Sequence, residues 1–115
     1  FRRALEQGCD KVVAVLTRER GYVKKPERAE HITNSLYRRY PKIVEDLEHR
    51  AERYNADMQE LLELEKQGKV FVIAPESTFG VGRTETDVAK LRRLYDEGFR
   101  MGAEQTEVLK SYLEK

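Results

Sequence analysis

The stretch Lys11-Val12-Val13-Ala14-Val15-Leu16-Thr17 decides the fold class of this 115-residue chain. A short run of apolar, mostly β-branched residues is typical of a strand that is buried on both faces of a parallel sheet. Val70-Phe71-Val72-Ile73-Ala74 repeats the pattern and is followed by Pro75. Helical patterns separate the two runs, and strands that alternate with helices imply a parallel sheet with right-handed crossovers. The sequence therefore predicts an α/β fold with two short parallel strands, and we expect the sheet to continue in residues outside this chain or in another chain.

A long amphipathic helix is predicted over about residues 42–67, ending at Gly68. Apolar residues recur there every three or four positions, which places them on one stripe of the helix. The stripe consists of Val44, Leu47, Ala51, Tyr54, Met58 and Leu61. We expect Asp46 and Arg50 to form an ion pair across one helical turn.

Three further helices are predicted around the strands, over residues 2–7, 27–40 and 87–115. Gly8 is expected to end the first of them, Pro41 to end or kink the second, and Thr86 to cap the third. On the third helix, we expect the buried stripe to consist of Val88, Leu91, Tyr95, Gly98, Gly102 and Leu109.

The charge is unevenly distributed, although the net charge is only +1. Residues Phe1–Lys42 hold 11 Lys/Arg and 5 Asp/Glu, a net +6, and Ile43–Lys115 hold 11 and 16, a net −5. A basic first third favours contact with an anionic surface such as phospholipid headgroups. The candidate membrane-facing residues are Lys24, Lys25, Arg28, Tyr37, Arg38, Arg39 and Tyr40. The alternative is that the cations only solvate the surface and the tyrosines pack on their own helix.

The single cysteine, Cys9, excludes an intrachain disulfide and suits a reducing compartment. We expect Cys9 to be buried beside the first strand. No apolar run approaches the roughly 20 residues that span a bilayer. The expected location is cytoplasmic, with peripheral contact at a membrane.

No residue pattern in the chain indicates catalysis, a cofactor or a metal site. There is no Gly-x-Ser-x-Gly elbow, and Ser35, Ser77 and Ser111 have no candidate base nearby in the sequence. His31 and His49 lack partners at metal-ligand spacing, and His49 is expected to form a solvated ion pair. Gly80-Val81-Gly82-Arg83 has the wrong glycine spacing for a dinucleotide site and no Walker lysine, so it predicts a plain turn.

Several stretches of the sequence resemble a known family. Residues 2–18, Arg-Arg-Ala-Leu-Glu-Gln-Gly-Cys-Asp-Lys-Val-Val-Ala-Val-Leu-Thr-Arg, resemble the helix and strand that follow the catalytic aspartate motif of bacterial patatin-like phospholipases. Tyr40-Pro41-Lys42, Arg53-Tyr54-Asn55 and Leu94-Tyr95-Asp96-Glu97-Gly98-Phe99 resemble the extended C-terminal region of one bacterial subgroup. The resemblance implies a three-layer α/β/α hydrolase with a serine–aspartate dyad and a glycine-rich oxyanion loop. None of those catalytic elements matches a position here, so no catalytic residue is transferred.

The resemblance implies that residues 1–115 are the C-terminal portion of a patatin-like domain with an incomplete sheet. Residues 1–75 would end the α/β core and carry a helical insertion at 27–67, and residues 76–115 would form a loop and a C-terminal helical segment. The expected role is a structural and lid-like segment of a phospholipase of lipid degradation, inactive alone. Its partner would be the missing N-terminal catalytic part or a second copy. The alternatives are a helical protein-interaction module that uses the Val44–Leu61 stripe and, less favoured, a nucleic-acid binder.

Overall fold

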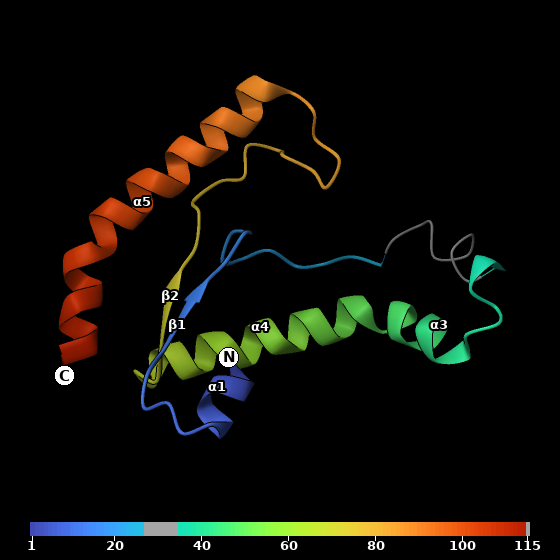
Figure 1. The fold of residues 1–115 in the computed structure, drawn as a ribbon, viewed down its shortest axis with the longest axis horizontal. Coiled ribbons are helices and arrows are strands. Elements are labelled where there is room, and N and C mark those ends of the chain that lie inside the picture. Colours follow the sequence, from blue (N-terminus) through green and yellow to red (C-terminus); the bar gives the residue numbers. More distant parts are fainter. Residues whose placement is uncertain (27–34, 115) are drawn as a thin grey trace. The chain divides into compact units, whose positions relative to one another are not determined.

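A computed structural model describes residues 1–26 and 35–114 of the chain. The element order is α1 (Arg2–Glu6), β1 (Val12–Val15), α3 (Pro41–Glu48), α4 (Arg50–Lys66), β2 (Val70–Ile73) and α5 (Val88–Glu114) (Figure 1). The described residues therefore belong to the mixed α/β class. They form two compact units, Phe1–Tyr22 with Glu63–Lys115, and Val23–Leu62.

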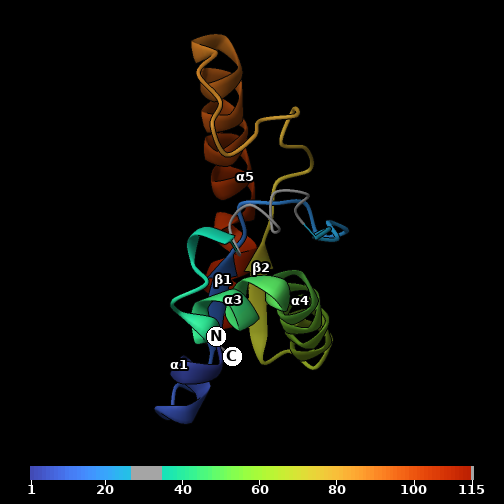
Figure 2. The ribbon, with the colours of Figure 1, turned by 90° about the vertical axis from the view of Figure 1, so that its right-hand side faces the viewer.

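The two predicted strands are confirmed, and they pair directly with each other in parallel (Figure 2). The register joins Val12 to Val70 and continues to Val15 opposite Ile73. Within the described part of the chain the sheet has only these two strands. No further strand lies between them, so any continuation of the sheet must lie beside them.

The expectation that both strands are covered on both faces is wrong for β1. In β2, Val70 and Val72 are only 2% and 1% exposed. In β1, by contrast, Val13 is 38% exposed and Val15 is 69% exposed. The apolar run predicted burial because such a strand needs cover, but the described residues do not supply that cover on the side of Val13 and Val15.

Each strand follows a helix, and the two helices, α1 and α4, end in the same way. Gly8 and Gly68 have φ values of +86° and +72°, which glycine adopts without strain. After α1, the Cys9 amide donates to the Ala4 carbonyl at 3.1 Å, and after α4 the Lys69 amide donates to the Leu64 carbonyl at 3.0 Å. This is the Schellman motif, which pairs the last carbonyls of a helix and turns the chain sharply. The predicted glycine stops are confirmed.

Helix α5 packs on the sheet with a face that matches the predicted one only in part. Met101 is its buried residue, and the ring of Tyr112 lies 5.5 Å from that of Phe71 in β2. Three residues of the predicted stripe, Val88, Leu91 and Tyr95, are exposed, whereas Gly102 and Leu109 are half-buried. Spacing alone placed the stripe to one side of the buried face; contact with β2 selects the face of Met101 and Tyr112. The cap is Asp87 rather than Thr86, because its carboxylate accepts the amides two and three residues later.

In the unit Val23–Leu62, the single helix predicted from residue 42 is two helices that meet at His49. Pro41 begins α3, since its ring suits the first helical position. Asp46 pairs with Arg53 at 2.8 Å instead of Arg50, and the same guanidinium also binds the Asp46 carbonyl.

The predicted stripe of this unit is confirmed. Ala51 and Leu61 are buried, and the other members are half-buried. Much of this surface is therefore already covered inside the chain, which weakens the alternative that it serves as a docking face. The helix predicted over 27–40 falls largely on residues 27–34, which lie outside the described residues.

Candidate functional site

An apolar pocket of about 200 Å³ lies where β1 and β2 end. We call it the strand-end pocket; it is lined by Val15, Leu16, Thr17, Ile73, Pro75, Leu94, Gly98 and Met101. Because the strands are parallel, their carboxyl ends meet at one edge, which is where α/β folds usually place ligands. A comparable apolar cavity of about 150 Å³ can hold a benzene-sized group. No residue that lines the pocket is a base or a metal ligand, so the pocket can bind an apolar group but has no means of acting on it.

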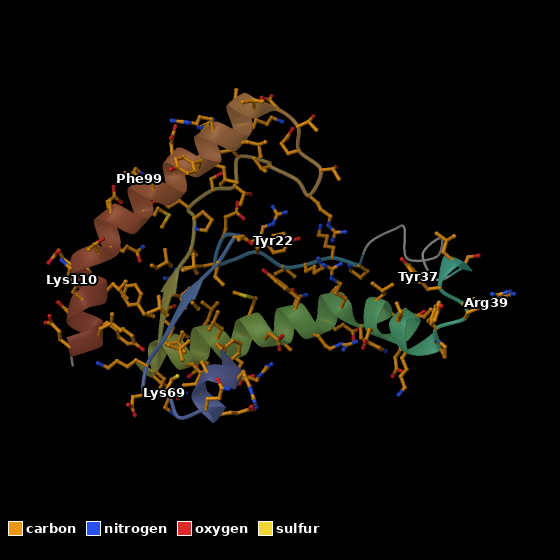
Figure 3. The ribbon with its side chains drawn as sticks, in the orientation of Figure 1. Tyr22, Tyr37, Arg39, Lys69, Phe99 and Lys110 are labelled. Atoms are coloured by element: carbon orange, nitrogen blue, oxygen red, sulfur yellow. The ribbon has the colours of Figure 1, made fainter. Side chains whose placement is uncertain are left out.

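Three consecutive charged residues follow β1 and bind the second strand and its loop; we call residues 18–20 the clasp. The Arg18 guanidinium donates to the Val81 carbonyl at 3.2 Å and lies 5.2 Å from the ring of Tyr22 (Figure 3). The contacts of the clasp were not predicted from the sequence, although three charged residues directly after the predicted strand 11–17 were a visible signal.

Glu19, the centre of the clasp, accepts two hydrogen bonds from Thr78. The Thr78 amide lies 2.7 Å from Oε1 of Glu19, and the Thr78 hydroxyl lies 2.8 Å from the same oxygen. Thr78 itself is only 6% exposed. A hydrogen bond from its own backbone amide, followed by those from Thr78, lowers the pKa of Glu19, because all of them favour the charged form.

Arg20 closes the outer edge of β2. Its guanidinium donates to the Val72 carbonyl at 2.7 Å and forms an ion pair with Glu65. The Leu16 amide donates to the Ile73 carbonyl at 2.8 Å, so the Ile73 carbonyl faces β1. Backbone direction alternates along a strand, and the Val72 carbonyl therefore faces the opposite, outer edge. By the same alternation, the backbone groups of Val13 and Val15 face the outer edge of β1, where the described residues hold no third strand.

The loop after β2 is tied to α5 by charged and aromatic contacts. Arg100 binds Glu97 and Glu104 on its own helix, and Glu76 in the loop at 3.7 Å. The guanidinium of Arg93 lies 3.9 Å from the ring centre of Phe79, whose φ is +52°. Gly80-Val81-Gly82-Arg83 belongs to this loop, and the Val81 amide closes a turn on the Thr78 carbonyl.

The candidate membrane-facing residues fall into two groups, with Arg28 outside the described residues. Lys24 contacts two residues of α4. Its backbone amide donates to the Asn55 side chain at 2.8 Å, and the Asn55 side-chain amide donates to the Lys24 carbonyl at 3.0 Å. The Lys24 ammonium lies 5.9 Å from the ring centre of Tyr54. Lys25 is exposed.

The other four candidates, residues 37–40, form an exposed turn before α3. Tyr37 and Tyr40 are 42% and 59% exposed, and the helix on which the alternative packs them falls largely on residues outside the described ones. Arg38 and Arg39 are exposed beside them.

The remaining candidate chemical groups are isolated. Cys9 is exposed, against the prediction, because the Schellman turn carries it away from β1. His49 pairs with Glu52 at 3.1 Å on an exposed surface, as predicted. In residues 1–26 and 35–114 no group of three or more His, Cys, Asp or Glu is arranged to hold a metal ion. Of the helices in the described ranges, none combines the length and hydrophobicity that a bilayer span requires.

Comparison with known proteins gives one match. A family model described as a domain of unknown function (DUF6363) matches residues 40–114. Neither the curated proteins nor the solved structures contain a match. The matched range includes α4, β2 and α5 but not β1. Strand β2, inside the matched range, therefore pairs with β1, which precedes that range. The match covers more than half of the chain, which therefore belongs to the DUF6363 family.

Proposed function

We propose that this chain is the C-terminal structural segment of a patatin-like lipid acyl hydrolase, in which the parent sheet continues beyond β1. The observation that carries the proposal is the asymmetry of the two sheet edges. Arg20 occupies the outer edge of β2, whereas β1 carries exposed valines, and no charged side chain of the described residues bonds to the backbone of Val13 or Val15. Natural sheets block free edges with charges, prolines or covering elements, so a bare apolar edge favours a neighbouring strand.

The strand-end pocket supports the same arrangement. Val15 lines the pocket and is 69% exposed. A strand added about 4.8 Å from β1 would bring its own side chains beside Val13 and Val15. These side chains, or an apolar group of the substrate, would fill the pocket. The sequence resemblance of residues 2–18 points to the same place in the family, after the aspartate of the dyad.

The proposed division of labour follows from the chemistry. The described part of the chain brings no serine or cysteine together with a base. The serine nucleophile, the aspartate and the oxyanion donors would come from the preceding part of the parent, which would hydrolyse an acyl ester of a lipid. This segment would complete the sheet and cover one end of it.

The test is to express the full-length reading frame beside this chain and to treat both with a fluorophosphonate probe and a short-chain p-nitrophenyl ester. We expect the full-length protein to be labelled at a Gly-x-Ser-x-Gly serine and to turn over the ester. The 115-residue chain should do neither. Full-length protein without such a serine, or turnover by the chain that is lost on mutating Ser35, Ser77 or Ser111, would contradict the proposal.

A further inference from the structure

An exposed segment, residues 36–43, combines apolar side chains with cations. Leu36 is 77% exposed, Tyr37 42%, Tyr40 59% and Ile43 42%. Arg38, Arg39 and Lys42 lie between them, and all three are exposed. The segment contains no carboxylate. Four large apolar groups and three cations are thus presented together within eight residues.

The cations of segment 36–43 differ from several others in the described part of the chain. Among the described residues, no carboxylate forms an ion pair with Arg38, Arg39 or Lys42. Figure 3 shows Arg39 extending away from the ribbon. By comparison, Arg92 pairs with Asp96 at 3.3 Å, and Arg93 covers the ring of Phe79.

The backbone holds this arrangement in a turn. The Tyr40 amide donates to the Tyr37 carbonyl at 2.7 Å, and the Ile43 amide donates to the Tyr40 carbonyl at 3.0 Å. Pro41 begins α3 directly after Tyr40. Tyr40 and Ile43 are therefore presented on a closed turn and the first turn of a helix, so little ordering remains to be done on binding.

We propose that segment 36–43 is a docking surface for an anionic phospholipid bilayer. Interfacial segments bind by burying apolar side chains at the headgroup boundary while cations attract anionic lipids. Tyrosine suits this boundary, because its ring is apolar and its hydroxyl is polar. The exposed aliphatic groups of Leu36 and Ile43 favour a bilayer over a single-stranded nucleic acid, since binding of single strands relies on aromatic stacking and cations, whereas a bilayer also buries aliphatic side chains. The surface goes beyond the structural role proposed above and does not depend on it.

The experiment is flotation of the 115-residue chain with vesicles of phosphatidylcholine alone or mixed with phosphatidylglycerol. Flotation separates bound chain from aggregates, which stay at the bottom of the gradient. We expect the chain to float with the mixed vesicles and not with the neutral ones. Binding should fall as salt is raised, because the Debye length shrinks from about 10 Å at 0.1 M to about 3 Å at 1 M.

Variants assign the binding to residues. Arg38→Gln with Arg39→Gln should lower the partition coefficient roughly thirty-fold, from the typical contribution of two cations near an anionic surface. Arg38→Lys with Arg39→Lys should retain most of the binding. Leu36→Ser with Ile43→Ser keeps every charge and should still weaken binding. The matched control is Arg92→Gln with Arg93→Gln, an adjacent arginine pair near Tyr95, which should have little effect.

Circular dichroism spectra of the variants should match that of the wild type, because all the substituted groups of segment 36–43 are exposed. Equal flotation with neutral vesicles would overturn the proposal. So would an equal loss in the Arg92 and Arg93 control, or no loss in the Arg38 and Arg39 variant. Tighter binding to a single-stranded oligonucleotide than to mixed vesicles, lost in the same variant, would assign the segment to nucleic acid instead.

Discussion

At the scale of single residues, Glu19 is the centre of the polar contacts at the carboxyl end of the sheet. Its carboxylate accepts the amide and the hydroxyl of Thr78, a residue that is 6% exposed. A buried donor without an acceptor costs about 1–3 kcal/mol. Glu19 therefore fixes the loop after β2 relative to β1.

We predict that Glu19→Ala loosens this loop. The Thr78 amide should exchange with solvent about 5- to 150-fold faster, corresponding to the loss of about 1–3 kcal/mol of local stability. The measurement is hydrogen exchange followed by NMR at Thr78. Glu63→Ala, which removes an exposed ion pair with Lys66, is the control and should leave Thr78 unchanged. Unchanged exchange in Glu19→Ala would show that the clasp does not hold the loop.

The lowered pKa of Glu19 gives this contact a pH dependence with a definite sign. A carboxyl group whose pKa is lower in the folded state stabilises that state above its unfolded pKa, and the stabilisation is lost as the pH falls through the folded pKa. The ordinary value is 4.5. We predict a constant protection factor at Thr78 above about pH 4.5 and a decline below it. Glu19→Gln should remove that decline, and a decline that persists in this variant would assign it to another carboxylate.

At the scale of secondary structure, the end of α5 is held by residues at the beginning of both strands. The Lys11 ammonium donates to the carbonyls of Tyr112 and Leu113, the latter at 3.0 Å. The Tyr112 hydroxyl donates to the Lys69 carbonyl at 2.8 Å, next to β2. A cation at the last carbonyls of a helix satisfies them and offsets the negative end of the helix dipole.

We predict that Lys11→Met frays the last turn of α5. The expected loss is about 0.3–1 kcal/mol, the typical contribution of a cation at a helix C-terminus. It should appear as faster amide exchange over residues 110–114, with the rest of α5 unaffected. Lys110→Met removes a cation that lies just before the last turn of α5, pairs with Glu107 and does not bind the end carbonyls, so it should fray the turn less. Equal fraying in the two variants would contradict the capping role of Lys11.

At the scale of the whole molecule, the unequal edges of the sheet govern association. The backbone groups of Val13 and Val15 face an edge without a partner strand in the described residues. An exposed apolar edge is a template for pairing with another chain. We expect the isolated chain to self-associate through β1 or to be loosely packed.

We predict that Val15→Lys reduces self-association, because a lysine on an edge strand opposes edge-to-edge pairing. Val15 is 69% exposed, so the substitution removes little packing inside the chain. Sedimentation at micromolar concentration should show wild-type oligomers and a smaller species for the variant. Val108→Lys, at an exposed position of α5, is the control and should behave as the wild type. A monomeric, cooperatively folded wild type would show that the chain closes its own core and needs no further strand.

The sequence by itself determined the features that depend on neighbouring residues. The β-branched runs predicted both strands, and their alternation with helices predicted that they are parallel. Gly8 and Gly68 predicted the helix ends, because left-handed backbone conformation is a local property of glycine. The three- and four-residue spacing of Val44 to Leu61 predicted one apolar stripe, which runs along α3 and α4.

Only the tertiary structure decided the features that depend on distant partners. Helix α5 buries a face that lies next to the predicted stripe and overlaps it, and contact with β2 selected the part that holds Met101. The roles of Glu19 and Arg20 depend on Thr78 and Val72, more than fifty residues away along the chain, so no local pattern could assign them. The exposure of Val15 likewise reflects which elements are present to cover it. An apolar strand sequence predicts that both faces of the strand are buried. Whether they are buried depends on which strands and helices pack against them.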